Sequence, residues 1–482
     1  MLRLSCLLMS FLLIACSPGE QSDGSSQLEA RIDNIENGLI SSLQIKGQTQ
    51  EQYNINERLE ELGIPGLSVA FSSNGEVEWT RAYGLADTTE NRPMTTSSFL
   101  LAGSISKPVA AVRALQLVED GVFNLDDNIN DYLTSWQVPD NEFTVSEKVT
   151  LRRILNHTAG LTVSGFPGYD KGDDVPSVVE VLDGLGNTDP VRVFRQPGEA
   201  WQYSGGGYTI MQQAITDAEK RSFPETMQEN VLDRLSMTGS TYENPLPAQF
   251  HAMAATGYRA NGDEVEGKWP IYPEMAAAGL WTTPSELIQY AIEIQRILRT
   301  GQDGVLRHDT VVEMLDADGN EHGLGPSVDE HTFGHGGADE GFTAELIAWK
   351  DRPIAVVVMV NSDNRKIIRE LLLSIANEYD LPGIEPVVRE IVEIEPEALL
   401  KFAGQYELEQ VGVFDITVDG KRLKFSGVDS DYTGWLLPRS DHEFFGSESG
   451  SIVTFEVQDG VAVGFESRGI RAVRLGHPPA SD

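Results

Sequence analysis

The sequence predicts an α+β body followed by a small all-β domain. Two strand pairs lie far apart in the chain, within residues 67–83 and 342–360, and helical apolar patterns occupy the stretch between them. Strands at both ends of a helical stretch favour one sheet packed against helices. Beyond residue 396 the pattern changes to short strands separated by tight turns, which is typical of a barrel or sandwich.

The first strand pair surrounds the dipeptide Asn74-Gly75, which favours a two-residue turn between residues 67–71 and 77–83. The second pair comprises residues 342–349 and the unbroken apolar run 354–360, which indicates a strand buried on both faces. We therefore expect the two pairs to share one sheet.

Four helices are expected between these pairs, from apolar residues spaced three and four apart. In the first of them Val109, Val112, Leu115 and Val118 fall on one face. The expected helices are residues 108–119, 150–155, 208–219 and 284–298.

Composition gives the expected domain limits. A Ser-, Gly- and Gln-rich stretch from Ser17 to Gln27 predicts a flexible tether at residues 16–44, before a body at 45–380. Prolines and glycines predict a linker at residues 381–396, and residues 397–482 are expected to form the all-β domain. Its expected strands are residues 406–408, 414–418, 423–425, 452–457 and 461–465.

The 482-residue chain has 74 acidic against 36 basic residues and a formal net charge of -38. This excess repels nucleic-acid phosphates, so we expect no nucleic-acid partner. A well-solvated surface explains the acidity without any specific cationic partner.

The first fifteen residues carry one charge, Arg3, and then an apolar run that is too short to span a bilayer. We interpret residues 1–15 as an export signal. The residues that follow the run, Leu13 to Cys16, resemble the cleavage box of bacterial lipoproteins, which implies a lipid anchor on Cys16. An ordinary secretory signal that ends near a cysteine is the alternative. Under both interpretations the protein leaves the cytoplasm, and as a lipoprotein it is expected in the bacterial cell envelope.

The stretch Gly103-Ser104-Ile105-Ser106-Lys107 places a hydroxyl and an amine three residues apart at the start of an expected helix. Residues i and i+3 share a helix face, and a serine attacks a carbonyl only when a nearby group accepts its proton. Ser104 is therefore the candidate nucleophile and Lys107 its candidate activating neighbour. The motif is weak by itself, since a capping serine followed by a solvated lysine gives the same letters.

Tyr203 precedes Ser204 and three glycines, where the backbone can turn sharply and leave the phenol beside a helix start. A tyrosine acts as a base only when neighbouring cations favour its ionised form, and Lys107 would be such a cation. Without another motif, a tyrosine in such a turn is more often a packing or hydrogen-bonding residue.

A third glycine-rich stretch, His335-Gly336-Gly337-Ala338, leads into the second strand pair. The N–H of Ala338 and that of Ser104 would together form an oxyanion hole, and His335 would add a positive or hydrogen-bonding group. A metal site built from His331 and His335 is the alternative. Because no acidic ligand pattern such as H-E-x-x-H accompanies the two histidines, we expect no metal.

In this order, Ser104-Ile105-Ser106-Lys107, Tyr203-Ser204-Gly205 and His335-Gly336-Gly337 resemble the three motifs of the serine β-lactamase and penicillin-binding-protein superfamily, in particular its class C-like branch. The resemblance covers residues from about 45 to 375. It implies an antiparallel sheet flanked by helices, a helical second lobe, and an acyl-enzyme mechanism without a cofactor. It also implies that His157 is a structural neighbour of the site. The all-β domain resembles the lipocalin-like modules that follow some of these hydrolases.

Two positions depart from the superfamily pattern. Gly205 stands where β-lactamases and transpeptidases usually carry Asn, and His335 stands where they usually carry Lys. Both changes remove groups that grip penicillin-like substrates and are similar to the esterase and D-amino-acid peptidase relatives. The resemblance therefore implies a small ester, peptide or peptidoglycan-derived substrate. The alternative is a non-hydrolytic envelope protein that binds peptidoglycan peptides or β-lactams, and the oligomeric state stays open.

Overall fold

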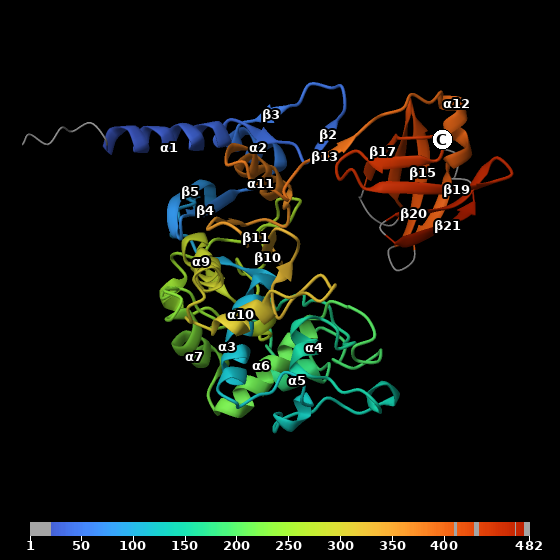
Figure 1. Cartoon of the computed structure of the whole chain (residues 1–482). Helices are drawn as coiled ribbons and strands as arrows, with labels where there is room; N and C mark the ends of the chain where they lie inside the picture. The colour runs from blue at the N-terminus through green and yellow to red at the C-terminus, as the bar shows by residue number, and fades with distance from the viewer. Residues whose placement is uncertain (1–20, 409–411, 429–432, 468, 477–482) are drawn as a thin grey trace, which may run out of the picture.

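The protein forms an α+β body and a separate β-barrel, as the sequence predicts (Figure 1). The structure is a computed structural model that describes residues 21–408, 412–428, 433–467 and 469–476. The expected signal, residues 1–15, and the expected lipid anchor, Cys16, lie outside the described residues. Among the described helices none is both long and apolar enough to cross a membrane.

A seven-stranded sheet forms the centre of the described body, in the order β6-β5-β4-β12-β11-β10-β9 (Figure 1). In that order, its strands are Arg92–Pro93, Glu76–Asp87, Gly66–Ser73, Ala355–Val360, Phe342–Trp349, Thr332–Asp339 and Ser327–Val328. The neighbouring strands are antiparallel. Because β4 pairs with β12, the two predicted strand pairs do share one sheet.

The turn between β4 and β5 has the backbone that its sequence predicts. Asn74 and Gly75 have φ angles of 56° and 83°, both in the left-handed region that a two-residue turn of this kind requires. The predicted apolar run in β12 is also buried on both faces. Val356 and Val358 pack in the cluster that contains helix α11 (Lys366–Glu378), whereas Val357 packs in the larger cluster on the opposite face.

The chain segment before the sheet corrects one prediction, because most of residues 16–44 does not form a flexible tether. Helix α1 (Gln21–Glu36) places Ile32 and Ile35 in the core shared with α11, and β1 (Leu39–Ile40) is buried and paired with β3 (Gln52–Tyr53). The body therefore begins at α1 rather than at residue 45. The polar composition of the first turns of α1 hides the apolar spacing that follows it.

The four predicted helices are present, and the first is more deeply buried than predicted. They are α3 (Ser106–Glu119), α4 (Leu151–Leu155), α6 (Gly205–Glu219) and α9 (Pro284–Thr300). All residues of α3 from Ser106 to Leu117 are buried, so this helix is central and not amphipathic at a surface. The other described α-helices of the body are α2 (Ile55–Leu62), α5 (Val178–Leu182), α7 (Phe223–Met227), α8 (Met275–Ala278) and α10 (His308–Met314).

The C-terminal domain is a closed barrel of eight consecutive antiparallel strands. They are β14 (Gly404–Leu408), β15 (Gly412–Asp419), β16 (Arg422–Gly427), β17 (Thr433–Pro438), β18 (Glu443–Gly446), β19 (Ile452–Gln458), β20 (Val461–Ser467) and β21 (Ile470–Gly476). Helix α12 (Pro396–Leu399) and the turn after it place Leu399 and Phe402 in the barrel core. The sequence did not predict β17, β18 or β21.

The predicted linker at residues 381–396 has more structure than expected. Its strand β13 (Val387–Arg389) pairs in parallel with β2 (Leu43–Ile45), and Arg389 Nε donates a hydrogen bond of 2.9 Å to the Gly450 carbonyl oxygen of the barrel. Strand β2 begins in the segment that was expected to be a tether. The β2–β13 pairing therefore joins a segment that precedes the sheet in the chain to one that follows it, next to the barrel (Figure 1).

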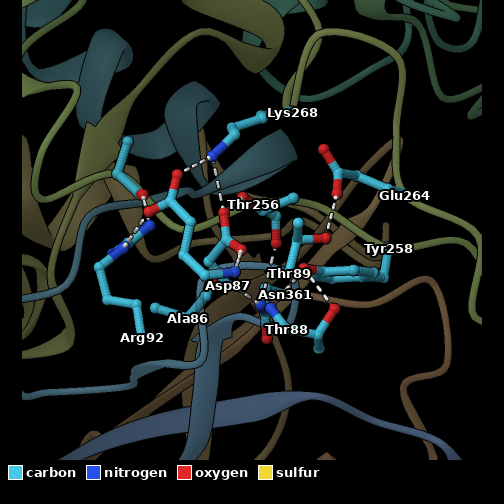
Figure 2. A network of polar contacts seen from close by, with 12 residues as sticks. Ala86, Asp87, Thr88, Thr89, Arg92, Thr256, Tyr258, Glu264, Lys268 and Asn361 are labelled. Carbon is cyan, nitrogen blue, oxygen red and sulfur yellow. Dashed lines mark hydrogen bonds and ion pairs between the residues drawn. The ribbon is translucent and has the colours of Figure 1, made fainter.

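A buried polar network joins the end of β5 to the loop before α8 (Figure 2). Asp87 is fully buried and accepts hydrogen bonds from Lys268 Nζ at 2.8 Å and Thr256 Oγ1 at 2.7 Å, while Asn361 Nδ2 donates to the Thr256 carbonyl oxygen at 2.9 Å. Burial alone would raise the pKa of Asp87, but these donors and the Glu90 N–H outweigh burial and lower the pKa to about 2.

Replacing Asp87 by Asn is expected to lower the free energy of unfolding near neutral pH and to flatten its decrease in acid. A carboxyl whose pKa is lower in the folded than in the unfolded chain stabilises the fold above about pH 4 and loses that effect as the pH falls through about 2. For Asp87 the effect is about 2 kcal/mol. Urea unfolding of both proteins between about pH 7 and pH 2.5 measures it.

Glu90→Gln is the matched control, because Glu90 contacts the same Lys268 with an exposed carboxylate. An exposed ion pair contributes at most about 1 kcal/mol, so this variant is expected to keep the acid dependence of the unmodified protein. If the free energy of unfolding decreased equally with falling pH in all three proteins, the role assigned to Asp87 would be contradicted.

Candidate active site

Ser104 and Lys107 lie in direct contact at the start of α3, as their spacing predicts. Lys107 Nζ donates a hydrogen bond of 2.9 Å to Ser104 Oγ and another of 2.8 Å to the carbonyl oxygen of Ala277, a residue of α8. Lys107 is 2% exposed, whereas Ser104 is only partly buried. The hydroxyl can therefore be reached from outside while the amine is held in place behind it.

The turn that carries Ser104 is packed backbone to backbone against β10. Gly103 has a φ of 54°, and a Cβ on it would lie 2.5 Å from the Ala338 nitrogen. A Cβ on Gly337 would overlap the Ala102 carbonyl oxygen. Real Cβ atoms do not approach so closely, so glycine is required at both positions and the two backbones meet without an intervening side chain.

The N–H of Ala338 points toward this turn. Asp339 and Phe342 pair across a two-residue turn, and such a closing pair exchanges both of its backbone hydrogen bonds. The next pair, Ala338 with Thr343, therefore directs its N–H groups away from the opposite strand. The structure thus brings the Ala338 N–H to the side of Ser104, where the sequence predicts an oxyanion hole.

Tyr203 lies beside the same lysine, at the start of α6. Its neighbour Ser204 is the N-cap of α6 and accepts a hydrogen bond from the Gly207 N–H. The Lys107 Nζ lies 5.0 Å from the centre of the Tyr203 ring. The three predicted motifs are therefore gathered around one hydroxyl.

His335 is buried on β10, and its ring is neutral. Its Nδ1 forms a hydrogen bond of 2.6 Å with the Gly336 carbonyl oxygen. Burial, then the positive charge of Lys107 and the neighbouring His322, lower the pKa of His335 to about 3. Of the two roles predicted for this side chain, the structure favours the hydrogen-bonding group over the positive one. The alternative partner His331 lies elsewhere, against Gly383.

Two further histidines line the site, and the sequence analysis gave neither of them a catalytic role. His157 accepts a hydrogen bond of 3.1 Å from the Ser204 N–H and its ring lies 4.3 Å from that of Tyr203, which agrees with the structural role that the resemblance implies. His322 lies 4.9 Å from the His157 ring and 5.3 Å from the His335 ring. No sequence motif marks His322, because only folding brings it to the other two.

Two buried carboxyl groups, also missed from the sequence, interact with each other, and one of them, Asp339, also interacts with Lys107. Burial raises the pKa of Asp339 well above its usual range, although Lys107 and the Gly103 N–H oppose the rise. Burial likewise raises the pKa of Glu274 to about 7, and neither oxygen of this carboxyl has a hydrogen-bond partner among the described residues. Burial therefore favours the neutral form of both carboxyl groups, as it does for the imidazole of His335.

Comparison with known proteins identifies relatives of this chain. The Beta-lactamase family model matches residues 52–376. Penicillin-binding protein 4* of Bacillus subtilis (strain 168) is 20% identical over 416 residues, which cover 78% of this chain and 87% of that protein. Protein flp of Staphylococcus aureus (strain N315) is 22% identical over 343 residues, which cover 67% of this chain but only 65% of flp.

Solved structures show the same fold. The octameric penicillin-binding protein homologue from Pyrococcus abyssi superposes with a TM-score of 0.61 at 20% identity, over 87% of this chain and 98% of that one. SurE with D-Leu gives 0.56 at 22% identity, over 87% and 97%. The D-amino acid amidase from Ochrobactrum anthropi SV3 gives 0.53 at 19% identity, over 67% and 97%.

These likenesses confirm the β-lactamase-like arrangement of sheet and helices that the three motifs imply, with the eight-stranded barrel following it. The matched region contains the Ser104 turn, Tyr203 and β10. Since the match spans more than half of its residues, this chain belongs to the Beta-lactamase family.

Proposed function

We propose that the protein is a serine hydrolase that cleaves ester or amide bonds through an acyl-enzyme on Ser104. The observation that carries the proposal is the 2.9 Å hydrogen bond between Lys107 Nζ and a partly exposed Ser104 Oγ. A buried amine held against a reachable hydroxyl is the arrangement that an activated serine nucleophile needs.

The proposed acylation uses the groups around Ser104 in defined roles. Lys107 and Tyr203 together take the Ser104 proton while Oγ attacks the carbonyl carbon, and the N–H groups of Ser104 and Ala338 hold the oxyanion. The Lys107 Nζ lies 5.0 Å from the centre of the Tyr203 ring, so the amine and the phenol are close enough to act on this proton together. No cofactor takes part in this scheme.

The substrate class that fits best is a small ester or a D-amino-acid amide or peptide, including fragments derived from peptidoglycan. His335 is neutral and Gly205 has no side chain, so neither supplies the charged or amide group expected for gripping a penicillin-like carboxylate. The likeness to a D-amino acid amidase and to SurE with D-Leu supports the same choice. We also propose a place in the class C-like branch, with slow or absent β-lactam turnover.

The second candidate function is a non-hydrolytic envelope protein that binds peptidoglycan peptides or β-lactams. The likeness to penicillin-binding protein 4* and to a penicillin-binding protein homologue favours it. A chromogenic short-chain ester separates the two, because a burst followed by steady turnover supports the hydrolase and stoichiometric labelling without turnover supports the binding protein.

We further propose that the protein is exported and anchored to a membrane of the cell envelope through a lipid on Cys16. The lipoprotein-like residues before Cys16 support this proposal. Palmitate labelling in a bacterial host tests it, with Cys16→Ser as the matched variant, and labelling that survives this change would contradict it.

Replacing Ser104 by Ala is expected to abolish labelling by a fluorophosphonate probe and to reduce ester turnover by at least about 10⁴-fold, since the acylated oxygen is removed. Lys107→Ala is expected to reduce labelling strongly but to leave the labelled residue unchanged. Mass spectrometry of the labelled peptide measures both. Labelling of Ser104→Ala at the same peptide would refute the nucleophile assignment.

Replacing Gly337 by Ala is expected to slow acylation by about 10²-fold or more, because the new Cβ would push β10 away from the Ala102 carbonyl and displace the Ala338 N–H. The rate of probe labelling measures the effect. Gly165→Ala is the control, since a Cβ at Gly165 meets open space. Equal labelling rates in the two variants would show that the close contact does not position the oxyanion hole.

A further inference from the structure

His157, His322 and His335 form one buried cluster beside Tyr203. Their exposed fractions are 1%, 7% and 5%, and one ring nitrogen of each lies within 4.8 Å of those of the other two. Each ring also has a buried nitrogen without a hydrogen-bond partner among the described residues, namely Nε2 of His157, Nδ1 of His322 and Nε2 of His335. A buried polar atom left without a partner costs free energy, so this cluster is built to hold a ligand.

The tautomer of His157 follows from its backbone contact. The Ser204 N–H donates to His157 Nδ1, so that nitrogen presents a lone pair and the proton of a neutral ring is on Nε2. The unpartnered atom of His157 is therefore a hydrogen-bond donor.

His335 has the opposite tautomer. Its Nδ1 contacts the Gly336 carbonyl oxygen, which can only accept, so Nδ1 holds the proton and Nε2 presents a lone pair. The unpartnered atom of His335 is therefore an acceptor. The unpartnered Nδ1 of His322 has no contact that fixes its role, so it can donate or accept.

All three rings are neutral near pH 7. Burial lowers the pKa of His157 well below its usual value, and that of His322 to about 4. The positive charge of Lys107 acts in the same direction on both. The cluster therefore presents hydrogen-bonding groups without a positive charge of its own.

Three clustered histidines are a common metal site, but this pattern of donors and acceptors disfavours a metal ion. A metal needs a lone pair from every ligand, and His157 Nε2 has a proton instead. The ligand must accept from His157 and donate to His335, which a neutral hydroxyl-type group does. One water can bridge the three rings, because one nitrogen of each ring lies within 4.8 Å of those of the other two, and a water that bonds at about 2.8 Å to three atoms spans such separations. Buried waters make about three such bonds.

We propose that His157, His322 and His335 hold the water molecule that hydrolyses the acyl-enzyme on Ser104. The proposal rests on the proposed hydrolase function and adds His322 as a positioning residue. The cluster adjoins the groups that would take the water's proton, because the Tyr203 ring lies 4.3 Å from His157, 5.8 Å from His322 and 6.1 Å from His335.

The step balances within the site. The water oxygen forms a bond to the acyl carbon, and the bond between that carbon and Ser104 Oγ breaks. One proton of the water passes through the pair of Lys107 and Tyr203 to Oγ, which regenerates the serine hydroxyl and releases the acid product. The imidazoles hold the water in position and do not take its proton.

The test is burst kinetics of His322→Phe with a chromogenic short-chain ester. Phe keeps a ring of similar shape but removes both nitrogens, so we expect the burst amplitude to stay near that of the unmodified protein while steady turnover falls by about 10-fold or more. His322→Asn puts a polar atom near the position of Nδ1 and is expected to recover part of the turnover. Hydroxylamine, a nucleophile that does not need the held water, is expected to restore turnover in His322→Phe.

The control is His308→Phe, since His308 lies at the start of α10 and its ring contacts the exposed Asp309. Unchanged steady turnover in His322→Phe, or an equal loss of burst and turnover, would overturn the inference. So would one equivalent of Co²⁺ that binds the unmodified protein with visible absorption bands and fails to bind His322→Phe, since the ligand would then be a metal. A missing burst in the unmodified protein would instead refute the proposed function.

Discussion

The arrangement of the site depends on one close approach of two backbones. The turn at Ala102 and Gly103 lies directly against Gly337 and Ala338 of β10, with no side chain between them. This contact fixes where Ser104 stands relative to an N–H of the sheet, and the sheet in turn is the most extensively paired part of the body. The proposed nucleophile, held by backbone against backbone, has little freedom to move, which suits a site that must align several groups at once.

The second constraint is the burial of α3. The amine of a lysine on a surface helix would be solvated. Lys107 is instead buried in α3, and its amine is fixed by a hydrogen bond to the Ala277 carbonyl oxygen. The polar network at Asp87 helps to hold the β10–β11 hairpin, because Tyr258 belongs to this network (Figure 2). The backbone N–H of Tyr258 donates to the Gly341 carbonyl at the tip of the hairpin, and its backbone carbonyl accepts from the Asp363 N–H. The hairpin and the helix are thus both held before any substrate arrives.

The sequence predicts the parts of this arrangement that depend on local patterns. Ser104, Lys107, Tyr203 and the glycines of β10 stand in recognisable spacings, and the sheet strands have strong apolar or turn signals. Helix α1 was missed because its polar first turns conceal the apolar face that α11 covers. The sequence could not show that His322 belongs to the site, because a single histidine in a loop forms no pattern. Only the fold brings it next to His157 and His335.

Burial shifts the pKa values of the buried acids and bases of the site in opposite directions, but in both cases it favours the neutral form. It lowers the pKa of His335 to about 3 and raises the pKa of Asp339 well above its usual range, so burial favours the neutral form of both groups. In the proposed mechanism, the His335 ring therefore does not compete for the proton that passes among Ser104, Lys107 and Tyr203. In the same mechanism, the low polarity of these surroundings would strengthen the attraction between Lys107 and the negative charge that develops during the proposed acyl transfer.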